Sequence, residues 1–570
     1  MSVGSALATL DESLSSLISQ WNGYSTGIVT VLALIITYAI TTRVEPDVHP
    51  MFLARQAHGS PVRQEGESPI YRSNTAPHSM PLNSGLNVKD AGASKWSMGR
   101  DGDLRDIWRR AVNGPPAEDG SAPSNFKGRI YTVHGKQNVI EHKLDDITRQ
   151  INLVGQHISS QGAKKVAIYL PNSVEYMATL FACSFYNLTA VLLPFGEPEA
   201  SVISMLQQSG ADTVVTSPGA FPFDTVVKSY PALRQLIWVV DEGNKHLDWN
   251  EVPQGMGGKV NVSTWQDILN DNPQTAGTEL PAANAKSVAP DVIMFWKTPD
   301  SVEEMVQFTQ GNLVSGVSAQ MTAIPTKERF GPADLFLPAA SLSSSFTLVL
   351  ALTAIYSNAS VAFSSVADAP DLALATQGIA PTILVATPET LNKTLGETKG
   401  KVSSALASLS HWVQTRSLIQ NGAMPAASFL ASWNESARPR IGTTPGKLRL
   451  LYVAHPISTI AKPSLSELAL SDLRVFTGAR IIYALSAPQC AGAVAQTQYH
   501  DYRVSGNGTG SHFGPPLSST EVMLRSTGAH KITDDSYKGE IVVRGPAVVG
   551  GESALGVVAF IRDDNTIAFA

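Results

Sequence analysis

The stretch KVAIYLPNSVEYMATLFACSFYNLTAVLLPF, residues 165–195, sets the architecture of this chain. An apolar run, VAIYL, is followed by the helical segment EYMATLFACSFYN and then by a second apolar run, AVLLPF. Short apolar runs are typical of buried strands, and a helix between two of them lets the strands pair in parallel. Asn172 and Ser173 are suited to cap this helix, and Glu175 suits its first turn. The stretch therefore predicts a βαβ unit.

The same alternation continues on both sides of this unit. Apolar residues recur at helical spacing over residues 139–161, and the helix VISMLQQSG and the strand DTVVT follow. Further strand and helix patterns run on to LRLLYVA, so the chain is predicted to have an α/β fold with a mainly parallel sheet and helices on both faces. Residues 335–367 are also uncharged, but serines and Asn358 interrupt them. This favours a buried helix between strands over a second membrane span.

The amino-terminal part carries a candidate membrane anchor. Residues 1–22 form an amphipathic segment that ends at an interfacial tryptophan, and residues 23–42 are predicted to be a single transmembrane helix, because YSTGIVTVLALIITYAITT is long enough to cross a hydrocarbon core. No basic region precedes the apolar run and no clean small-x-small site follows it, which argues against a cleaved signal peptide. A buried core helix is the alternative, but such a helix rarely stands alone before a polar linker.

The charges around this segment predict its orientation. No Lys or Arg precedes it, whereas Arg43, Arg55 and Arg63 follow it, so the positive-inside rule places the large domain in the cytosol. There the two cysteines stay reduced, and the six N-x-S/T sequons stay unused: Asn187, Asn261, Asn358, Asn392, Asn434 and Asn507. Residues 43–125 are rich in Pro, Gly, Ser and charge and predict a largely irregular linker, with a short helix over residues 104–112.

Composition excludes several classes of protein. A chain of 570 residues, 43% hydrophobic and 16% charged, is long enough for two or three globular domains. The net charge of -6 gives no reason to expect a nucleic-acid partner. Cys183 and Cys490 are the only cysteines and lie in apolar contexts, so a disulfide framework and a zinc site are excluded. Lone histidines, such as His455 and His512, lack partners at ligand spacing.

Two further blocks, beside residues 165–195, carry a resemblance. Residues 295–313, FWKTPDSVEEMVQFTQGNL, align without a gap with Y-T-S-G-T-T-G-x-P-K-G-V-x-x-T-H-G-N-L, and KGEIVVRGP matches G-E-L-x-I-R-G-P. The chain thereby resembles the AMP-binding (acyl-adenylate-forming) superfamily, and within it the long-chain acyl-CoA synthetases. The resemblance implies the large N-terminal domain of such an enzyme, layered sheets with helices plus a small β part. We place the α/β core at residues 126–480 and the β-rich end at 481–570, and we expect the C-terminal lid domain to be absent.

The resemblance also implies where a nucleotide would bind, and what has changed there. Its positional equivalents are Thr298, Thr309, Tyr483 and Ser486. The departures are Glu304 in the lysine position, Ala487 in place of the magnesium-binding Glu of Y-G-x-T-E, and Ala554 in place of the ribose-binding Asp. A loop that wraps phosphate needs glycines and a cation, and magnesium needs oxygen ligands.

The functional expectation follows from these departures. The family implies an acid–thiol ligase, but the losses argue against activity, so we expect no catalytic residue, no metal and no cofactor. The leading hypothesis is a membrane-anchored, acyl-CoA synthetase-like pseudoenzyme of lipid metabolism, at the endoplasmic reticulum or lipid droplets. It would bind a fatty acyl ligand or a protein partner as a lipid-binding, regulatory or scaffolding protein. One alternative is a divergent, active long-chain fatty acid–CoA ligase that uses ATP and Mg²⁺. Another is a purely structural membrane interaction protein.

Overall fold

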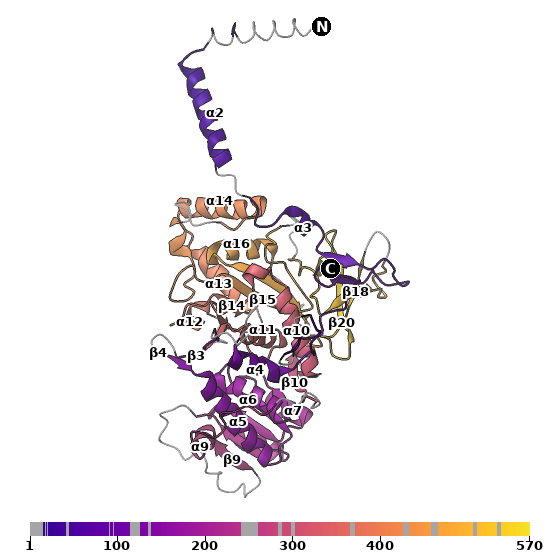
Figure 1. The fold of residues 1–570 in the computed structure, drawn as a ribbon. Coiled ribbons are helices and arrows are strands. Elements are labelled where there is room, and N and C mark those ends of the chain that lie inside the picture. Colours follow the sequence, from indigo (N-terminus) through magenta and orange to yellow (C-terminus); the bar gives the residue numbers. More distant parts are fainter. Residues whose placement is uncertain are drawn as a thin grey trace.

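The computed structural model describes most of the chain. The described residues are 15–16, 19, 21–41, 45–89, 92–94, 96–114, 126–134, 138–240, 260–282, 288–297, 303–364, 371–425, 432–457, 465–504, 510–532 and 537–569. They form two large sheets with helices packed on them and a smaller sheet at the carboxyl-terminal end, while helix α2 projects from the globule (Figure 1). The predicted α/β architecture is confirmed.

The first large sheet contains the βαβ unit on which the sequence prediction rests. Its seven strands have the order β11-β10-β6-β5-β7-β8-β9, and all neighbours are parallel except β10 and β11. The strands are β5 (Lys165–Tyr169), β6 (Thr189–Leu192), β7 (Thr213–Thr216), β8 (Gln235–Trp238), β9 (Asn261–Thr264), β10 (Val292–Lys297) and β11 (Glu303–Phe308). Its helices are α5 (Leu144–Ser160), α6 (Val174–Phe185), α7 (Glu199–Ser209), α8 (Phe223–Ser229) and α9 (Trp265–Asn270).

Helix α6 connects this sheet to the second one. Ser173 caps it as predicted, since its side chain accepts a hydrogen bond from the Tyr176 amide. Asn172 does not cap the helix. Its side chain instead donates to the carbonyls of Pro338 and Ala340 and accepts from the Leu342 amide, so it holds the loop that follows β12.

The second large sheet has eight strands in the order β17-β16-β15-β14-β12-β13-β3-β4. They are β3 (Ile130–His134), β4 (Asn138–His142), β12 (Leu335–Pro338), β13 (Ser360–Ser364), β14 (Ile383–Ala386), β15 (Leu450–Pro456), β16 (Arg480–Ser486) and β17 (Ala495–Gln496). The helices are α10 (Gln310–Thr322), α11 (Ser345–Tyr356), α12 (Leu372–Ala375), α13 (Pro388–Lys401), α14 (Ala405–Asn421) and α16 (Glu467–Thr477). Helix α11 is buried along almost its whole length, which confirms the prediction of a core helix within 335–367.

The third sheet corrects the predicted linker. It has the order β1-β2-β18-β19-β20-β21, with β1 (Ala57–Gly59), β2 (Tyr71–Ser73), β18 (Glu521–Arg525), β19 (Lys538–Arg544), β20 (Glu552–Ile561) and β21 (Ile567–Phe569). The described residues between 45 and 114 therefore pack into the fold, because β2 pairs with β18. Helix α4 (Leu104–Asn113) confirms the helix predicted over residues 104–112, and it buries Ile107 and Trp108 in the core. Pairing partners so distant in sequence leave no local periodicity, and for this reason the segment was predicted to be irregular.

The amino-terminal helix exposes apolar side chains. Helix α2 spans Gly23–Thr41, and Ile28, Leu34 and Ile36 are exposed by 62, 64 and 57%. A second short helix, α3 (Pro50–Ala54), follows where the chain joins the globule. None of the described helices combines the length and hydropathy that a membrane span requires. The transmembrane helix expected over residues 23–42 stays a prediction.

Candidate functional site

The stretch aligned with a phosphate loop is a β-hairpin at the edge of the first sheet. Strand β10 pairs antiparallel with β11, and Trp296 faces Glu304 in the register. Thr298, in the connection between them, lies outside the described residues. Glu304 is exposed, and its carboxylate accepts a 3.1 Å hydrogen bond from Nε2 of Gln489. A carboxylate at this position repels a phosphate.

Thr309 is a helix cap. Its Oγ1 accepts from the Asn312 amide and donates to Asn312 Oδ1 at 2.8 Å, while Oδ1 also accepts from the Thr309 amide. This reciprocal pattern satisfies the first backbone donors of α10. Nδ2 of Asn312 donates to the carbonyls of Pro546 and Val548, at 2.8 and 3.2 Å. The matching residues of this block therefore hold α10 to the loop after β19.

The residues at the end of strand β16 are buried by other parts of the protein. Tyr483 and Ala487 have no exposed surface, and Ser486 is 2% exposed. The Tyr483 hydroxyl accepts from the Leu465 amide at 3.3 Å, and its ring centroid lies 5.0 Å from that of Phe513. Tyr483 thus belongs to the aromatic core and does not present its ring or hydroxyl to a ligand.

Two backbone contacts seal the segment that follows β16. The amide of Ala491 donates to the carbonyl of Ala547, and the amide of Val549 donates to the carbonyl of Gln489, both at 2.9 Å. The cap of α10 and the segment after Ala487 thus both bond to one loop, residues 545–549. Glu304 on the hairpin is linked to the same loop through Gln489. Ala554 is placed separately, since it is exposed on β20 opposite Val542 in the small sheet.

Magnesium and ATP do not fit this arrangement. Ala487 offers a buried methyl group where a metal needs an oxygen, the Thr309 hydroxyl is engaged in the cap, and Glu304 has the same charge as a phosphate. Across the described parts of the chain, no group of three or more His, Cys, Asp and Glu residues is arranged to hold a metal ion. The expectation of no metal and no cofactor stays a prediction.

Comparisons with known proteins agree with the arrangement of sheets and helices described above. The family model of AMP-binding enzymes matches residues 144–294, and the resemblance seen in the sequence is confirmed. A structure of the anthranilate CoA ligase AuaEII in complex with anthranoyl-AMP is similar, with a TM-score of 0.56 and 15% identity over 82% of this chain and 77% of that one. The chain has the AMP-binding fold.

Two further structures share the AMP-binding fold. The inhibitor-bound N-terminal domain of FACL13 from Mycobacterium tuberculosis has a TM-score of 0.55 and 13% identity, over 82% of this chain and 99% of that one. Coronafacic acid ligase from Pectobacterium brasiliense has a TM-score of 0.54 and 14% identity, over 82% of this chain and 77% of that one. No curated protein sequence matches the chain. Likeness at these identities establishes the fold alone.

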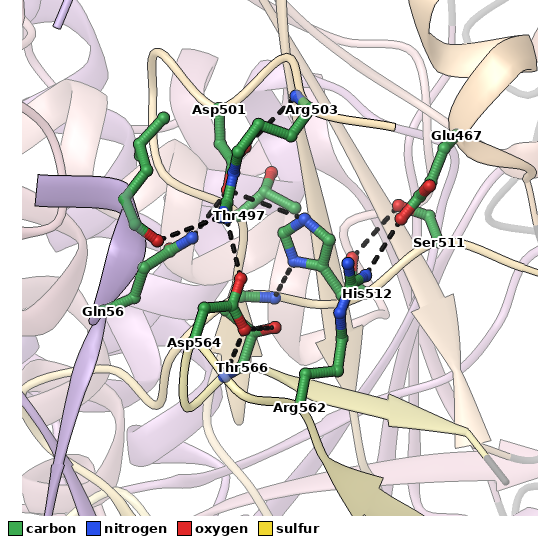
Figure 2. A network of polar contacts seen from close by, with 12 residues as sticks. Gln56, Glu467, Thr497, Asp501, Arg503, Ser511, His512, Arg562, Asp564 and Thr566 are labelled. Atoms are coloured by element: carbon green, nitrogen blue, oxygen red, sulfur yellow. Dashed lines mark hydrogen bonds and ion pairs between the residues drawn. The ribbon is translucent and has the colours of Figure 1, made fainter. Parts of the chain in front are cut away.

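A buried polar network near the end of this AMP-binding fold was missed by the sequence analysis (Figure 2). Asp501 Oδ2 accepts from Gln56 Nε2 at 2.6 Å and from Arg503 at 2.6 Å, and Arg503 also reaches Asp564 at 2.8 Å. Burial alone would raise the pKa of Asp501, but the Arg503 hydrogen bonds and the nearby charges hold it well below its usual range. These residues come from three distant segments, so no local spacing could have revealed the cluster.

His512 belongs to the same network. Its Nδ1 accepts from the Gly514 amide at 3.1 Å, which leaves Nε2 facing Asp501 Oδ2 at 3.5 Å. Burial lowers the pKa of His512 despite the neighbouring Asp501. The contacts join the amino-terminal segment, the loop after β17 and the last strands, and we therefore assign the network to structure.

A cavity of about 340 Å³ lies beside this network. Gln56 and Gln496 line it, both almost fully buried, and Gln56 Oε1 and Gln496 Nε2 have no hydrogen-bond partner among the described residues. None of the residues aligned with the nucleotide site lines it.

Proposed function

We propose that this chain is a membrane-tethered protein of the AMP-binding fold that does not form acyl-adenylate. It serves lipid metabolism as a lipid-binding, regulatory or scaffolding protein. The observation that carries the proposal is the state of the candidate nucleotide site. Ala487 is fully buried, Thr309 caps α10, and Glu304 accepts from Gln489.

The chemistry explains why these features argue against catalysis. Adenylyl transfer depends on positioning the phosphates and on stabilising the charge that develops on them. A cation and a metal normally supply that stabilisation. At the positions aligned with the cation and the metal ligand, this chain has the Glu304 carboxylate and the Ala487 methyl group. The carboxylate repels the phosphates, however well they are positioned.

The proposed tether rests on α2. An isolated helix that exposes Ile28, Leu34 and Ile36 leaves apolar area in water, which lipid would remove. Arg55 and Arg63 follow α2, so we propose a cytosolic domain on an endoplasmic reticulum or lipid-droplet membrane. A topology assay on the sequons tests this orientation: expression in cells should leave Asn507 unmodified, and a glycan there would contradict it.

A second candidate function is a divergent fatty acid–CoA ligase that uses ATP. The family match over residues 144–294 favours it, and so does the similar structure of AuaEII, a CoA ligase in complex with anthranoyl-AMP. The residues at the candidate site do not fit Mg²⁺ and ATP, and for that reason we rank this candidate second. A purely structural membrane protein is a third.

One assay separates these candidates. Full-length protein is incubated with ATP, Mg²⁺, a long-chain fatty acid and coenzyme A, and pyrophosphate and acyl-CoA are measured. We expect no product above the protein-free control. Product that is lost in Ser486→Ala, while the variant unfolds at the wild-type temperature, would establish the ligase instead. For a protein without product, lipid mass spectrometry then distinguishes a co-purifying acyl chain from a protein scaffold.

A further inference from the structure

Helix α14 has an inverted pattern of side chains. Its buried stripe is small and polar for the most part, whereas the exposed face of its first half is mostly apolar. The buried residues are Ala407, Ser410, Gln414 and Leu418. The large apolar residues that are exposed are Leu406, Leu409, Trp412 and Val413, at 56, 50, 54 and 36%. The exposed polar residues are Ser408 among them and Arg416, Gln420 and Asn421 at the other end of the helix. A helix on the surface of a soluble protein has the opposite arrangement, so this exposed stripe is suited to an apolar environment.

The polar side of α14 is fixed to the globule. Nε2 of His411 contacts Asp472 Oδ1 on α16 at 2.9 Å, and the His411 ring stacks on Phe476 with centroids 4.2 Å apart. Nε2 of Gln414 donates to Ser410 Oγ at 2.9 Å within the buried stripe. Because the His411 contacts with α16 set the rotation of α14 about its axis, Leu406 and Leu409 stay outward.

The charge of α14 suits a lipid surface. The helix contains no Asp or Glu, and Arg416 is its only Arg or Lys. The guanidinium carbon of Arg416 lies 5.1 Å from the centre of the Trp412 ring, and Arg416 Nε donates to Gln420 Oε1 at 3.0 Å. Arginine and tryptophan side by side are favoured at the boundary between headgroups and acyl chains, where the charge reaches water or phosphate and the ring stays in the interface.

The chain that leaves α2 joins the globule at the end of α14. The amide of Asp47 donates to the carbonyl of Gly422, the C-cap of α14, at 3.0 Å, and the Tyr502 hydroxyl donates to Asp47 Oδ2 at 2.8 Å. Residues 42–46 separate α2 from this junction, and they can span about 20 Å at most. Figure 1 shows α14 lying across the end of the globule from which α2 projects. The environment that receives α2 therefore adjoins α14.

We propose that α14 lies in the interfacial region of the membrane that α2 enters, with Leu406, Leu409 and Trp412 in contact with lipid. The partner is thus a bilayer surface, and the helix fixes how the α/β domain is oriented on it. The exposed apolar residues lie within residues 406–413, about 12 Å of the 17-residue helix, so the first half of α14 contacts lipid in the membrane plane. This inference rests on the proposed tether, and the experiment distinguishes the failure of each.

The test is site-specific labelling of the full-length protein. Leu409→Cys, Leu32→Cys on α2 and Asn270→Cys on α9 each receive a polarity-sensitive fluorophore, in vesicles of phosphatidylcholine and phosphatidylserine with nitroxide-bearing lipids. The native thiols of Cys183 and Cys490 are buried, and burial raises the pKa of both, so they stay unlabelled. Asn270 is exposed, and α9 lies at the opposite end of the globule (Figure 1).

We expect the Leu409 and Leu32 labels to be quenched several-fold more than the Asn270 label. Quenching at Leu32 without quenching at Leu409 overturns the inference and leaves the tether standing. Quenching at neither position overturns both. A Leu409 label that is shielded from water and yet not quenched by lipid nitroxides shows that a protein or a second copy covers α14, which also overturns the inference.

Discussion

The side-chain amide of Gln489 donates a 3.1 Å hydrogen bond to the carboxylate of Glu304. This contact joins the hairpin that aligns with a phosphate loop to the segment that follows β16. Gln489 also accepts from the Val549 amide through its carbonyl. Residues from both halves of the candidate nucleotide site are therefore bonded to each other, which gives the site a structure that needs no ligand.

Replacing Glu304 with Lys restores the charge of the family's loop but should not restore ATP binding. Glu304 is exposed, so the change should alter the free energy of unfolding by about 0.5 kcal/mol or less. Thermal unfolding with and without Mg-ATP measures the result, and Gln489→Ala serves as the control that removes the same hydrogen bond. A melting temperature that rises with ATP in the Lys variant alone would show that phosphates reach the hairpin.

Replacing Ala487 with Glu should destabilise the protein and should not create a magnesium site. Ala487 has no exposed surface, so a longer, charged side chain must both displace neighbours and lose its hydration. We expect a loss of about 3 kcal/mol or more. Chemical denaturation of the variant and of Ala554→Glu, at an exposed position of β20, gives the comparison. A stable Ala487→Glu protein whose melting temperature rises with Mg²⁺ would contradict the closed site.

Replacing Asn312 with Ala should cost stability. The variant loses half of the α10 capping box and both hydrogen bonds to the loop after β19. We expect the free energy of unfolding to fall by about 1–3 kcal/mol. Asn421→Ala is the control, because Asn421 is exposed and its side chain donates to Ser417 on its own helix. If both variants lost the same free energy of unfolding, Asn312 would not stabilise the contact between α10 and the loop after β19.

Some of this architecture could be predicted from the sequence and some could not. The run VAIYL and its neighbours have the period and length of buried strands, so β5, β6 and their parallel pairing followed from local pattern. Strands β1 and β2 did not, since β1 pairs only with β2, and β2 has its other partner, β18, more than four hundred residues away. The cap at Thr309 could have been found, because Thr and Asn three residues apart before an apolar run indicate a helix start.

Sequence patterns also predicted only some of the surroundings of individual side chains. The apolar run that ends in β16 already indicated that Tyr483 would be buried, whereas the alignment alone assigned it to a nucleotide. The contacts of Asp501 with Gln56, Arg503 and His512 depend on three segments meeting in space. Sequence spacing carries no information on such a meeting: it shows that His512 has no partner at ligand spacing, which agrees with its structural role, but not which groups surround it.

Replacing His512 with Asn should weaken the dependence of stability on pH. Burial lowers the pKa of His512 in the folded protein, so below an unfolded pKa of about 6.5 the unfolded chain binds a proton that the folded chain does not. The contribution of His512 to stability is therefore complete above that pKa and is lost as pH falls toward its folded pKa. Asp501 stays ionised in this window, because its own pKa is held well below its usual range.

The measurement is the free energy of unfolding between about pH 7 and pH 5, where one such proton gives a slope of at most about 1.4 kcal/mol per pH unit. Asn preserves an acceptor for the Gly514 amide, so the variant should fold, with a lower stability at neutral pH and a flatter curve. Exposed His134→Asn is the matched control and should leave the curve unchanged. Parallel curves for wild type and His512→Asn would mean that His512 does not exchange its proton on unfolding. The acid sensitivity of the fold would then have to come from other groups, such as the half-buried His500 or the buried His455, whose pKa values burial also lowers.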